Sequence, residues 1–438
     1  MSTLEIGIWS FPVLLGLLFL RVPIGLAMFL TAFGGLWLVI GTPNMALARL
    51  KTEVYTTFSN YSLTIVPMFL LMGYFAAIGG MSQALFRAAE GFLGHRKGGV
   101  AMAAVGACAG FGAICGSSLA TAATMGRVAL PELKRYGYSG GFSTATLAAG
   151  GTLGILIPPS VILVIYAILT EQNIAKLFLA AFIPGILAAI GYMLAISIYV
   201  RIYPDSAGVR ERMPYRERFR ALMAVWPVLM VFLAVVGGIY GGIFTPTEGA
   251  AVGALGTGLI ALLNGGLNFR TLIDSFISTG RSTAMIFFIV LGAGFYNGFL
   301  ALTQVPQEMS RFVVEQGFSP WLVLIIILAL YLVFGCVMDS LSMILLTVPI
   351  FFPVISALDF GMSPEHLAIW FGILVLIVVE VGLITPPVGM NLFIINSMDR
   401  KTPIVETYKA VLFFVGSDVV RVAILVAFPA ITLFLIPA

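Results

Sequence analysis

Asp339 is a candidate for chemistry because it is a carboxylate within a long apolar stretch. A charged side chain at membrane depth costs about 2.5–3.5 kcal/mol on insertion scales and marks a functional site by default. With Ser340 and Ser342 beside it, Asp339 could line an ion or solute pocket. Asp is also a good helix N-cap, since its side chain accepts hydrogen bonds from free backbone N–H groups. Both roles stay open for Asp339, and Ser117 and Ser118 in an earlier stretch face the same choice.

Two hydrophobic segments are interrupted by consecutive prolines, Pro158-Pro159 and Pro386-Pro387. Proline lacks an N–H and clashes with the preceding turn, so a helix cannot pass through these pairs undisturbed. Thr152 and Thr385 lie near the breaks, where helix carbonyls lose their partners. Hydroxyl and free carbonyl oxygens together form a site that suits a small hard cation such as Na⁺.

The same breaks indicate where a solute would bind. Broken segments at matching positions in two halves of a chain are the best sequence indication of a transporter's binding site. Asn391 follows Gly389 just after the second proline pair and could supply a side-chain carbonyl or a solute contact. The residues that we predict to line the solute pocket are Asn391, Pro158, Pro159, Pro386 and Pro387.

Other charged residues within hydrophobic segments are weaker candidates. Asp418 and Arg421 are three residues apart and can pair on one helix face, which favours a structural ion pair over a solute site. Glu380 precedes the second break, where a proton or cation role and a supporting hydrogen-bond role are both open. We expect Arg127 to reach for the cytoplasmic interface and not for an anion.

Composition and the other reactive residue types indicate a membrane protein that is not an enzyme. Of the 438 residues, 60% are hydrophobic and 10% are charged, and apolar segments of about 20 residues, the length of a spanning helix, recur along the chain. Cys108, Cys115 and Cys336 lack metal-ligand spacing, and His95 and His366 lie near segment ends. We therefore expect no catalytic residues, no transition-metal site, no cofactor and no nucleic-acid partner.

The apolar pattern predicts an all-α polytopic membrane protein with six helical regions in each half. The predicted regions are 5–20, 23–41, 61–80, 98–133, 142–169 and 176–202, then 222–243, 246–264, 271–300, 320–357, 365–397 and 406–436. The stretches 98–133 and 320–357 are too long for one span, and each has a small, polar middle. We interpret each as a re-entrant hairpin, and two full spans remain the alternative. The regions 142–169 and 365–397 are the broken helices.

Matching motifs indicate that the two halves are internal duplicates. Phe111-Gly112 and Ser117 correspond to Phe334-Gly335 and Ser340 at an offset of 223 positions (334 − 111 and 340 − 117). The proline pairs are offset by 228 positions (386 − 158). Chance similarity between leucine- and glycine-rich segments is the alternative. Each half crosses the membrane an odd number of times, so the repeats are expected to be inverted, as 1–205 and 222–438.

The linker 206–221 sets the predicted orientation of the chain. It carries five of the six arginines found between residues 201 and 220, and cytoplasmic loops are enriched in Lys and Arg. If the linker is cytoplasmic and the predicted crossings are counted outward from it, most other basic residues also fall on the cytoplasmic side. Both termini are then predicted to face the opposite, outward side.

Several runs resemble the large membrane subunit, DctM type, of tripartite ATP-independent periplasmic (TRAP) transporters. These runs are Phe111-Gly112-Ala113-Ile114-Cys115-Gly116-Ser117-Ser118, then residues 151–160 (GTLGILIPPS), 247–251 (TEGAA), 385–391 (TPPVGMN) and 66–69 (VPMF). The resemblance covers essentially the entire chain. It implies inverted repeats, hairpins in a moving transport domain and an elevator-type transporter in a bacterial inner membrane. In that membrane the outward side predicted for both termini from the basic residues is the periplasm.

The resemblance also implies function and partners. It implies import of an organic acid, such as a C4-dicarboxylate, a sugar acid or a similar carboxylate, with Na⁺ as coupling ion. The implied partners are an extracytoplasmic solute-binding protein, a small four-helix membrane subunit and membrane lipid. The implied Na⁺-binding residues are Ser117, Ser118, Thr152, Gly154, Asp339, Ser340, Thr385 and Gly389.

Two other classes stay open at this stage: a free-standing symporter, and a membrane-embedded enzyme or channel. A free-standing Na⁺/carboxylate symporter that needs no binding protein would also use inverted repeats with hairpins. A membrane-embedded enzyme would need a nucleophile with a base, or metal ligands, and none is visible in the sequence. A channel would need a continuous polar lining, whereas the polar residues here cluster at two breaks and two hairpin tips.

Overall fold

The structure, a computed structural model, describes residues 1–436, and within them every regular element is a helix. Seven helical stretches are long and apolar enough to cross a membrane, or up to eight if the bent pair α8 (Gly140–Leu156) and α9 (Val161–Thr170) is one span. These stretches are Tyr61–Ile78, Ile174–Ile202, Tyr215–Tyr240, Pro246–Leu263, Phe269–Thr303, Pro364–Gly382 and Ile404–Ala427. The chain is therefore an all-α polytopic membrane protein, as predicted.

The helices of the first half follow the predicted order, with two additions. They are α1 (Thr3–Phe19), α2 (Ile24–Ile40), α3 (Pro43–Phe58), α4 (Ile65–Ile78), α5 (Met81–Leu93), α6 (Gly99–Cys115), α7 (Ser118–Arg135), α8, α9 and α10 (Ile174–Ile202). The apolar pattern of the sequence did not predict α3 and α5. Both carry charged residues, such as Arg49 and Glu53 in α3, so a search for apolar spans passes over them.

The second half begins with α11 (Tyr215–Met223), which a turn at 224–225 separates from α12 (Trp226–Phe232), and α12 continues into α13 (Gly238–Tyr240) through a π-helical turn at 233–237. The remaining helices are α14 (Pro246–Leu263), α15 (Phe269–Thr303), α16 (Val305–Glu315), α17 (Pro320–Gly335), α18 (Ser340–Ser356), α19 (Pro364–Gly382), α20 (Met390–Met398), α21 (Ile404–Ala427) and α22 (Pro429–Leu433). The amphipathic helix α16 was also missed, for the same reason.

Both predicted hairpins are pairs of helices separated by short turns, at 116–117 and 336–339. Ser117 caps α7 by accepting a hydrogen bond from the backbone N–H of Ala120 at 3.4 Å. Asp339 caps α18 by accepting from the N–H of Ser342 at 3.0 Å. These caps satisfy donors that a helix leaves free at its first turn. Each hairpin therefore places a capping side chain and a following serine at its tip.

A glycine contact joins the hairpin to the broken helix in each repeat. A Cβ atom on Gly112 of α6 would lie 2.6 Å from the Cα of Gly154 in α8. In the second repeat, a Cβ on Gly335 of α17 would lie 3.1 Å from the Cα of Gly382 in α19. Only residues without a side chain allow two backbones to come this close. The same contact thus recurs in both repeats.

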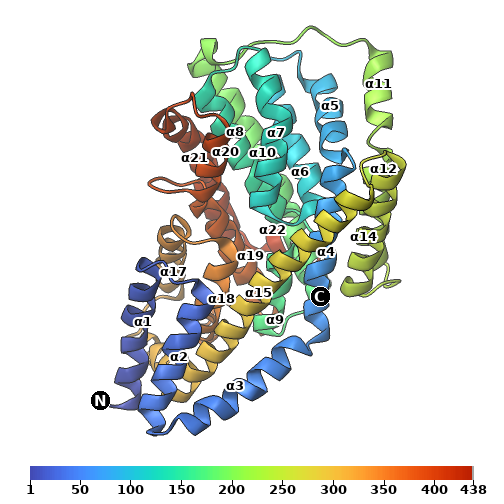
Figure 1. Cartoon of the computed structure of the whole chain (residues 1–438). Coiled ribbons are helices and arrows are strands. Elements are labelled where there is room, and N and C mark those ends of the chain that lie inside the picture. The colour runs from blue at the N-terminus through green and yellow to red at the C-terminus, as the bar shows by residue number, and fades with distance from the viewer. Residues whose placement is uncertain (437–438) are drawn as a thin grey trace.

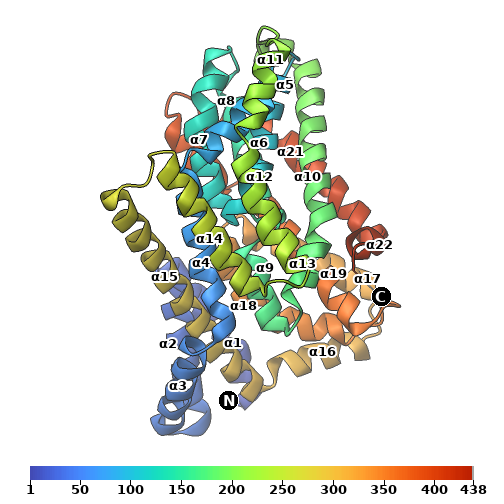
Figure 2. The same cartoon turned by 90° about the vertical axis from the view of Figure 1, so that its right-hand side faces the viewer.

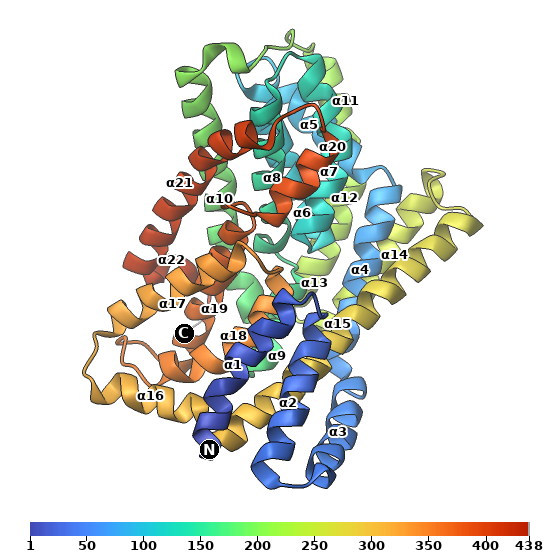
Figure 3. The same ribbon diagram turned by 60° about the vertical axis from the view of Figure 1, so that its left-hand side comes forward.

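The helices fall into two groups (Figure 1). Helix α4 packs on α14 and α15, α15 packs on α2, and α2 packs on α1 and α3. Figure 2 shows α4 beside α14, and Figure 3 shows α1 and α2 beside α15. The other group contains the hairpins, the broken helices, α10 and α21, with α8 packed on α6, α7 and α21.

The two repeats interlock within the second group. Helix α9, which follows the first break, packs on α18 of the second hairpin. Helix α20, which follows the second break, packs on α7 and α8 of the first repeat. Because each broken helix reaches the other repeat, the two hairpin tips are brought to one place.

Candidate functional site

Both hairpin tips contact one buried carboxylate, that of Glu380. The hydroxyl of Ser340 donates to Glu380 Oε1 at 2.6 Å, and the hydroxyl of Ser118 donates to Glu380 Oε2. Glu380 and Ser118 are fully buried, and Ser340 is nearly so. A buried carboxylate needs hydrogen-bond donors or a cation to offset its desolvation, and here two repeats supply the donors.

Local structure explains why these three residues meet. Ser118 and Ser340 are the first residues of α7 and α18, directly after the capping residues Ser117 and Asp339. Glu380 lies two residues before the end of α19, where the close approach of Gly382 and Gly335 holds α19 against the second hairpin. The carboxylate therefore sits at the level of both tips.

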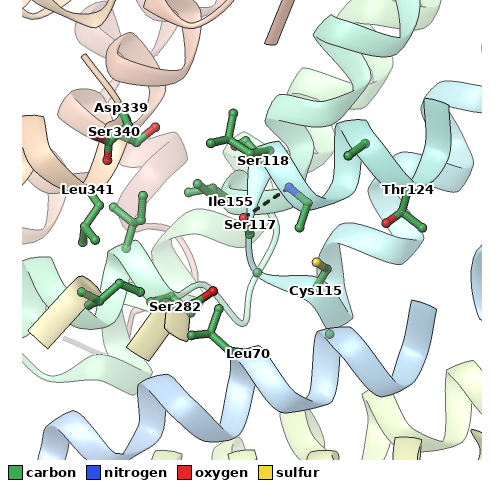
Figure 4. A pocket seen from close by; sticks show the side chains of 18 of the residues that line it. Leu70, Cys115, Ser117, Ser118, Thr124, Ile155, Ser282, Asp339, Ser340 and Leu341 are labelled. Carbon is green, nitrogen blue, oxygen red and sulfur yellow. Dashed lines mark hydrogen bonds between the residues drawn. The ribbon is translucent and has the colours of Figure 1, made fainter. Parts of the chain in front are cut away.

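A cavity of about 450 Å³ opens beside the tips. Its wall comes from both hairpin tips on one side and from α4 and α15 on the other. Figure 4 shows Ser117 and Ser118 facing the same space as Asp339 and Ser340, with Leu70 and Ser282 nearby. The polar side chains on the wall are Tyr74, Ser117, Ser118, Thr124, Arg127, Ser282, Asp339 and Ser340. The cavity thus lies between the two groups of helices.

Thr152 belongs to a different buried network. Its hydroxyl donates to the carbonyl of Ala149 at 2.7 Å and lies 2.9 Å from the hydroxyl of Tyr192. Tyr192 donates to Asp418 at 2.8 Å, and Asp418 lies 2.8 Å from Arg421. The ion pair predicted from the spacing of Asp418 and Arg421 is therefore present. The network links α8 of the first repeat to α10 and α21.

The predicted residues around the second break make structural contacts. Thr385 donates to the carbonyl of Val381 at 2.6 Å, and the N–H of Gly389, whose φ is 64°, donates to the carbonyl of Cys336 at 3.2 Å. Asn391 is fully buried and its side-chain amide donates to the carbonyl of Ala148 at 3.3 Å. The side-chain oxygen of Asn391 has no protein partner among residues 1–436.

The predicted site residues divide into two sets. Ser117, Ser118, Asp339 and Ser340 lie on the cavity wall. Thr152, Gly154, Thr385, Gly389 and Asn391 lie outside it, as do Pro158, Pro159, Pro386 and Pro387. The first proline pair is buried, whereas Pro386 is half-buried and Pro387 is exposed. The two hairpin tips therefore line one cavity, and the predicted residues at the breaks lie outside its wall.

Glu380 and Arg127 have positions in the structure that the sequence did not predict. The sequence left the role of Glu380 open. Its carboxylate accepts hydrogen bonds from Ser118 and Ser340, which are 262 and 40 positions away in the sequence. The only sequence signal for it was a carboxylate in an apolar helix. Arg127, which was expected to reach the cytoplasmic interface, lies on the cavity wall.

Comparisons with known proteins are consistent with this geometry. The family model for the DctM component of the tripartite ATP-independent periplasmic transporter matches residues 11–431. The C4-dicarboxylate TRAP transporter large permease protein DctM of Pseudomonas aeruginosa is 36% identical over 404 residues, covering 92% of each chain. The isethionate TRAP transporter permease protein DctMQ of Oleidesulfovibrio alaskensis is 31% identical over 92% of this chain and 65% of its own length.

A solved structure shows the fold alone. The crystal structure of the Alcanivorax borkumensis YdaH transporter, described as having an unusual topology, is similar to this chain with a TM-score of 0.63. The similarity covers 87% of this chain and 88% of the other, at 14% sequence identity. At this identity the comparison bears on architecture and not on solute.

Proposed function

Because the chain belongs to the DctM family of TRAP transporters, we propose that it couples the import of an organic acid to the inward movement of Na⁺. It is the large permease subunit of such a transporter, a multi-pass membrane protein and not an enzyme. The two relatives above are named for C4-dicarboxylate and isethionate, which are organic anions. The acid carried here is a C4-dicarboxylate, a sugar acid or a similar carboxylate.

The observation that carries this proposal is the meeting of both hairpin tips at Glu380, beside the cavity. Ser118 and Ser340 donate to the two oxygens of this carboxylate. Hydroxyl, carboxylate and carbonyl oxygens are the ligands that hard cations such as Na⁺ prefer. A cation bound near the tips would offset the cost of the buried negative charge. Binding of Na⁺ would then order the wall against which the solute rests.

The proposed cation ligands come from both repeats. Ser117, Ser118, Thr152 and Gly154 belong to the first repeat, and Asp339, Ser340, Thr385 and Gly389 belong to the second. Ser118 and Ser340 are the first residues of α7 and α18, and both donate to Glu380, which supports one site shared by the two repeats. The breaks at the two proline pairs contribute backbone carbonyls.

An elevator-type movement is supported by the division of the helices into two groups. The hairpins and broken helices pack on one another, and α1–α4, α14 and α15 form a second group that meets the first through α4 on α6 and α15 on α18. The cavity lies between the groups, with wall residues from both. Movement of the hairpin group past α4 and α15 would carry the cavity from one membrane face to the other.

The proposed partners are a small four-helix membrane subunit and a periplasmic solute-binding protein. The relative named DctMQ is longer than this chain, which covers 65% of it, and this is consistent with a second subunit fused to a large one. The proposed location is a bacterial inner membrane with the arginine-rich linker in the cytoplasm and both termini in the periplasm. Figure 1 shows the N-terminus at the opposite end of the molecule from the linker between α10 and α11.

Uptake of labelled acid by proteoliposomes, with Na⁺ or K⁺ outside, tests the coupling. The complex of the large subunit with its small subunit and solute-loaded binding protein is expected to import acid only with Na⁺. Ser117→Ala and Thr385→Ala each remove one hydroxyl oxygen without adding bulk, and both are expected to raise the Na⁺ concentration for half-maximal uptake. Ser356→Ala, at the exposed far end of α18, is the control. Unchanged Na⁺ dependence in both variants, with normal expression, would refute the assignment of these positions.

A further inference from the structure

Arg127 is the cationic side chain on the cavity wall, and the described chain leaves it without a counter-ion. It lies on α7, ten residues after Ser117 (127 − 117). Its Nε donates to the carbonyl of Ala123 in the same helix at 3.3 Å. No carboxylate of residues 1–436 forms an ion pair with it. The outer N–H groups of its guanidinium are therefore available to a ligand.

The one carboxylate on the cavity wall is engaged elsewhere. Asp339 accepts hydrogen bonds from the N–H of Ser342 at 3.0 Å and from the Ser342 hydroxyl. These contacts tie Asp339 to the first turn of α18. The charge of Arg127 is thus free to attract an anion from outside the protein. A guanidinium group binds a carboxylate through two parallel N–H···O bonds, which fixes both position and orientation.

The rest of the wall is largely apolar. Leu70, Leu119, Ile155, Ile162, Met285 and Ile286 contribute to it. Two of the wall hydroxyls, those of Ser118 and Ser340, already donate to Glu380. Of the remaining wall hydroxyls, those of Tyr74 and Ser282 lie 3.4 Å apart and can pair with each other, which leaves Ser117 and Thr124. A polyhydroxylated acid has more hydroxyls than these can satisfy, and burying a hydroxyl without a partner is unfavourable. An apolar body would instead be stabilised by the removal of its surface from water.

We propose that Arg127 binds the carboxylate of the transported acid, and that this acid has a compact apolar body. The inference rests on the proposed function and narrows its substrate class, since it disfavours sugar acids. The cavity volume of about 450 Å³ lies within the range of about 300–1,000 Å³ typical of small-molecule sites. Arg127 fixes the charged end, and the side chains from α4 and α15 cover the apolar end.

Three probes distinguish the chemistry that the cavity accepts. The full-length subunit, purified with its small subunit in NaCl, is mixed with 4-methyl-2-oxopentanoate, with the neutral 4-methylpentanamide or with N-acetylneuraminate. Thermal unfolding reports binding, since a ligand of the folded state raises the melting temperature. The branched oxo acid is expected to stabilise the protein, and the other two are not. Equal or greater stabilisation by the amide or the sugar acid would overturn the proposal, as would no stabilisation by the oxo acid.

Variants at Arg127 test the anchor itself. Hydrogen bonds to charged groups contribute about 1.5–3 kcal/mol, so Arg127→Gln is expected to weaken binding of the oxo acid roughly 10- to 100-fold. Arg127→Lys keeps the charge but loses the two-pronged geometry, so an intermediate loss is expected. Arg135→Gln is the matched control on the same helix, because Arg135 is exposed and pairs only with Glu132 at 3.6 Å. Binding by Arg127→Gln equal to that of the unmodified protein would overturn the proposal.

Transport separates this inference from the proposed function. If Arg127→Gln imports acid with an unchanged KM while uptake still requires Na⁺, Arg127 is not the anchor and the proposed function stands. If the unmodified complex shows no Na⁺-driven uptake of any acid, the proposed function fails and this inference falls with it. A raised KM with Na⁺ dependence retained is the expected result.

Discussion

At the scale of single residues, Glu380 connects parts of the chain that are far apart in sequence. Its carboxylate accepts from Ser118 in the first hairpin and from Ser340 in the second. Glu380→Gln preserves size but replaces one acceptor oxygen with an NH₂ group, so one serine loses its acceptor. We expect a lower melting temperature and faster hydrogen exchange at both hairpin tips, since each hydrogen bond to a charged group contributes about 1.5–3 kcal/mol. Mass spectrometry of exchanged peptides measures this directly.

A matched control for that variant exists on the same helix. Glu365 lies in the first turn of α19 and pairs with Lys176 at 2.6 Å, with about half of its side chain exposed (46%). Exposed ion pairs contribute about 0–1 kcal/mol, so Glu365→Gln should leave exchange at the tips unchanged. Unaltered protection at the tips in Glu380→Gln would show that the carboxylate does not hold them together.

A substitution of Asp339 can separate its two proposed roles, helix capping and ion or solute binding. It caps α18, and it also lies on the cavity wall. Asn caps a helix about as well as Asp, so Asp339→Asn should retain the fold and the melting temperature. We expect uptake to fall nonetheless, because the negative charge near the tips is lost. Near-normal uptake in proteoliposomes would leave capping as the only role of this residue.

The sequence identified the hairpin serines and Asp339, but not what they contact. Their signal was local, since each is a polar residue within an apolar stretch. The partnership of Glu380 with Ser118 depends on how two repeats fold together, across 262 positions, and no local pattern encodes it. The place of Arg127 on the cavity wall was not predicted, because the spacing along a helix does not say which neighbour each face meets.

At the scale of helices, close glycine contacts hold each hairpin against its broken helix. A Cβ on Gly112 would lie 2.6 Å from the Cα of Gly154, so Gly112→Ala forces α6 and α8 apart. Overpacking of this kind costs about 1–3 kcal/mol. We expect Gly112→Ala to lower the melting temperature and to reduce uptake, because the first tip shifts relative to Glu380.

Gly106 supplies the control on the same helix. A Cβ there would meet only the terminal methyl group of Met193, at an ordinary contact distance of 3.5 Å. Gly106→Ala should therefore not lower the melting temperature or the uptake, because Ala also has the better helix propensity. Equal behaviour of the two alanine variants would contradict the role assigned to the Gly112–Gly154 contact.

The apolar helices could be predicted from sequence, and the amphipathic ones could not. Length and hydropathy placed the long spans near their observed bounds, as with α10 at Ile174–Ile202 against a predicted 176–202. Helices α3, α5 and α16 are short and carry charge, so they resemble loops in a search for apolar segments. Their stability comes from packing against neighbouring helices, which the sequence alone does not display.

At the scale of the whole molecule, the two repeats interlock through their broken helices. Each broken helix leaves its own repeat and packs against the other, as α9 does on α18 and α20 on α7. The inverted repeats therefore share one site and do not form two separate ones. A disturbance at either break is expected to reach both hairpin tips.

The parts of the chain outside the membrane bear on how a dilute solute is captured. The connections between helices are short, and the longest polar one, residues 207–214, belongs to the arginine-rich linker. Such connections cannot enclose a dilute solute, so capture with high affinity must come from a separate protein. We expect the large subunit alone in proteoliposomes to show little or no uptake with Na⁺ outside. Adding the small subunit and the solute-loaded binding protein on the outer face should restore uptake. The same complex with the binding protein omitted is the control, and vigorous, saturable uptake by the lone subunit would instead indicate a free-standing symporter.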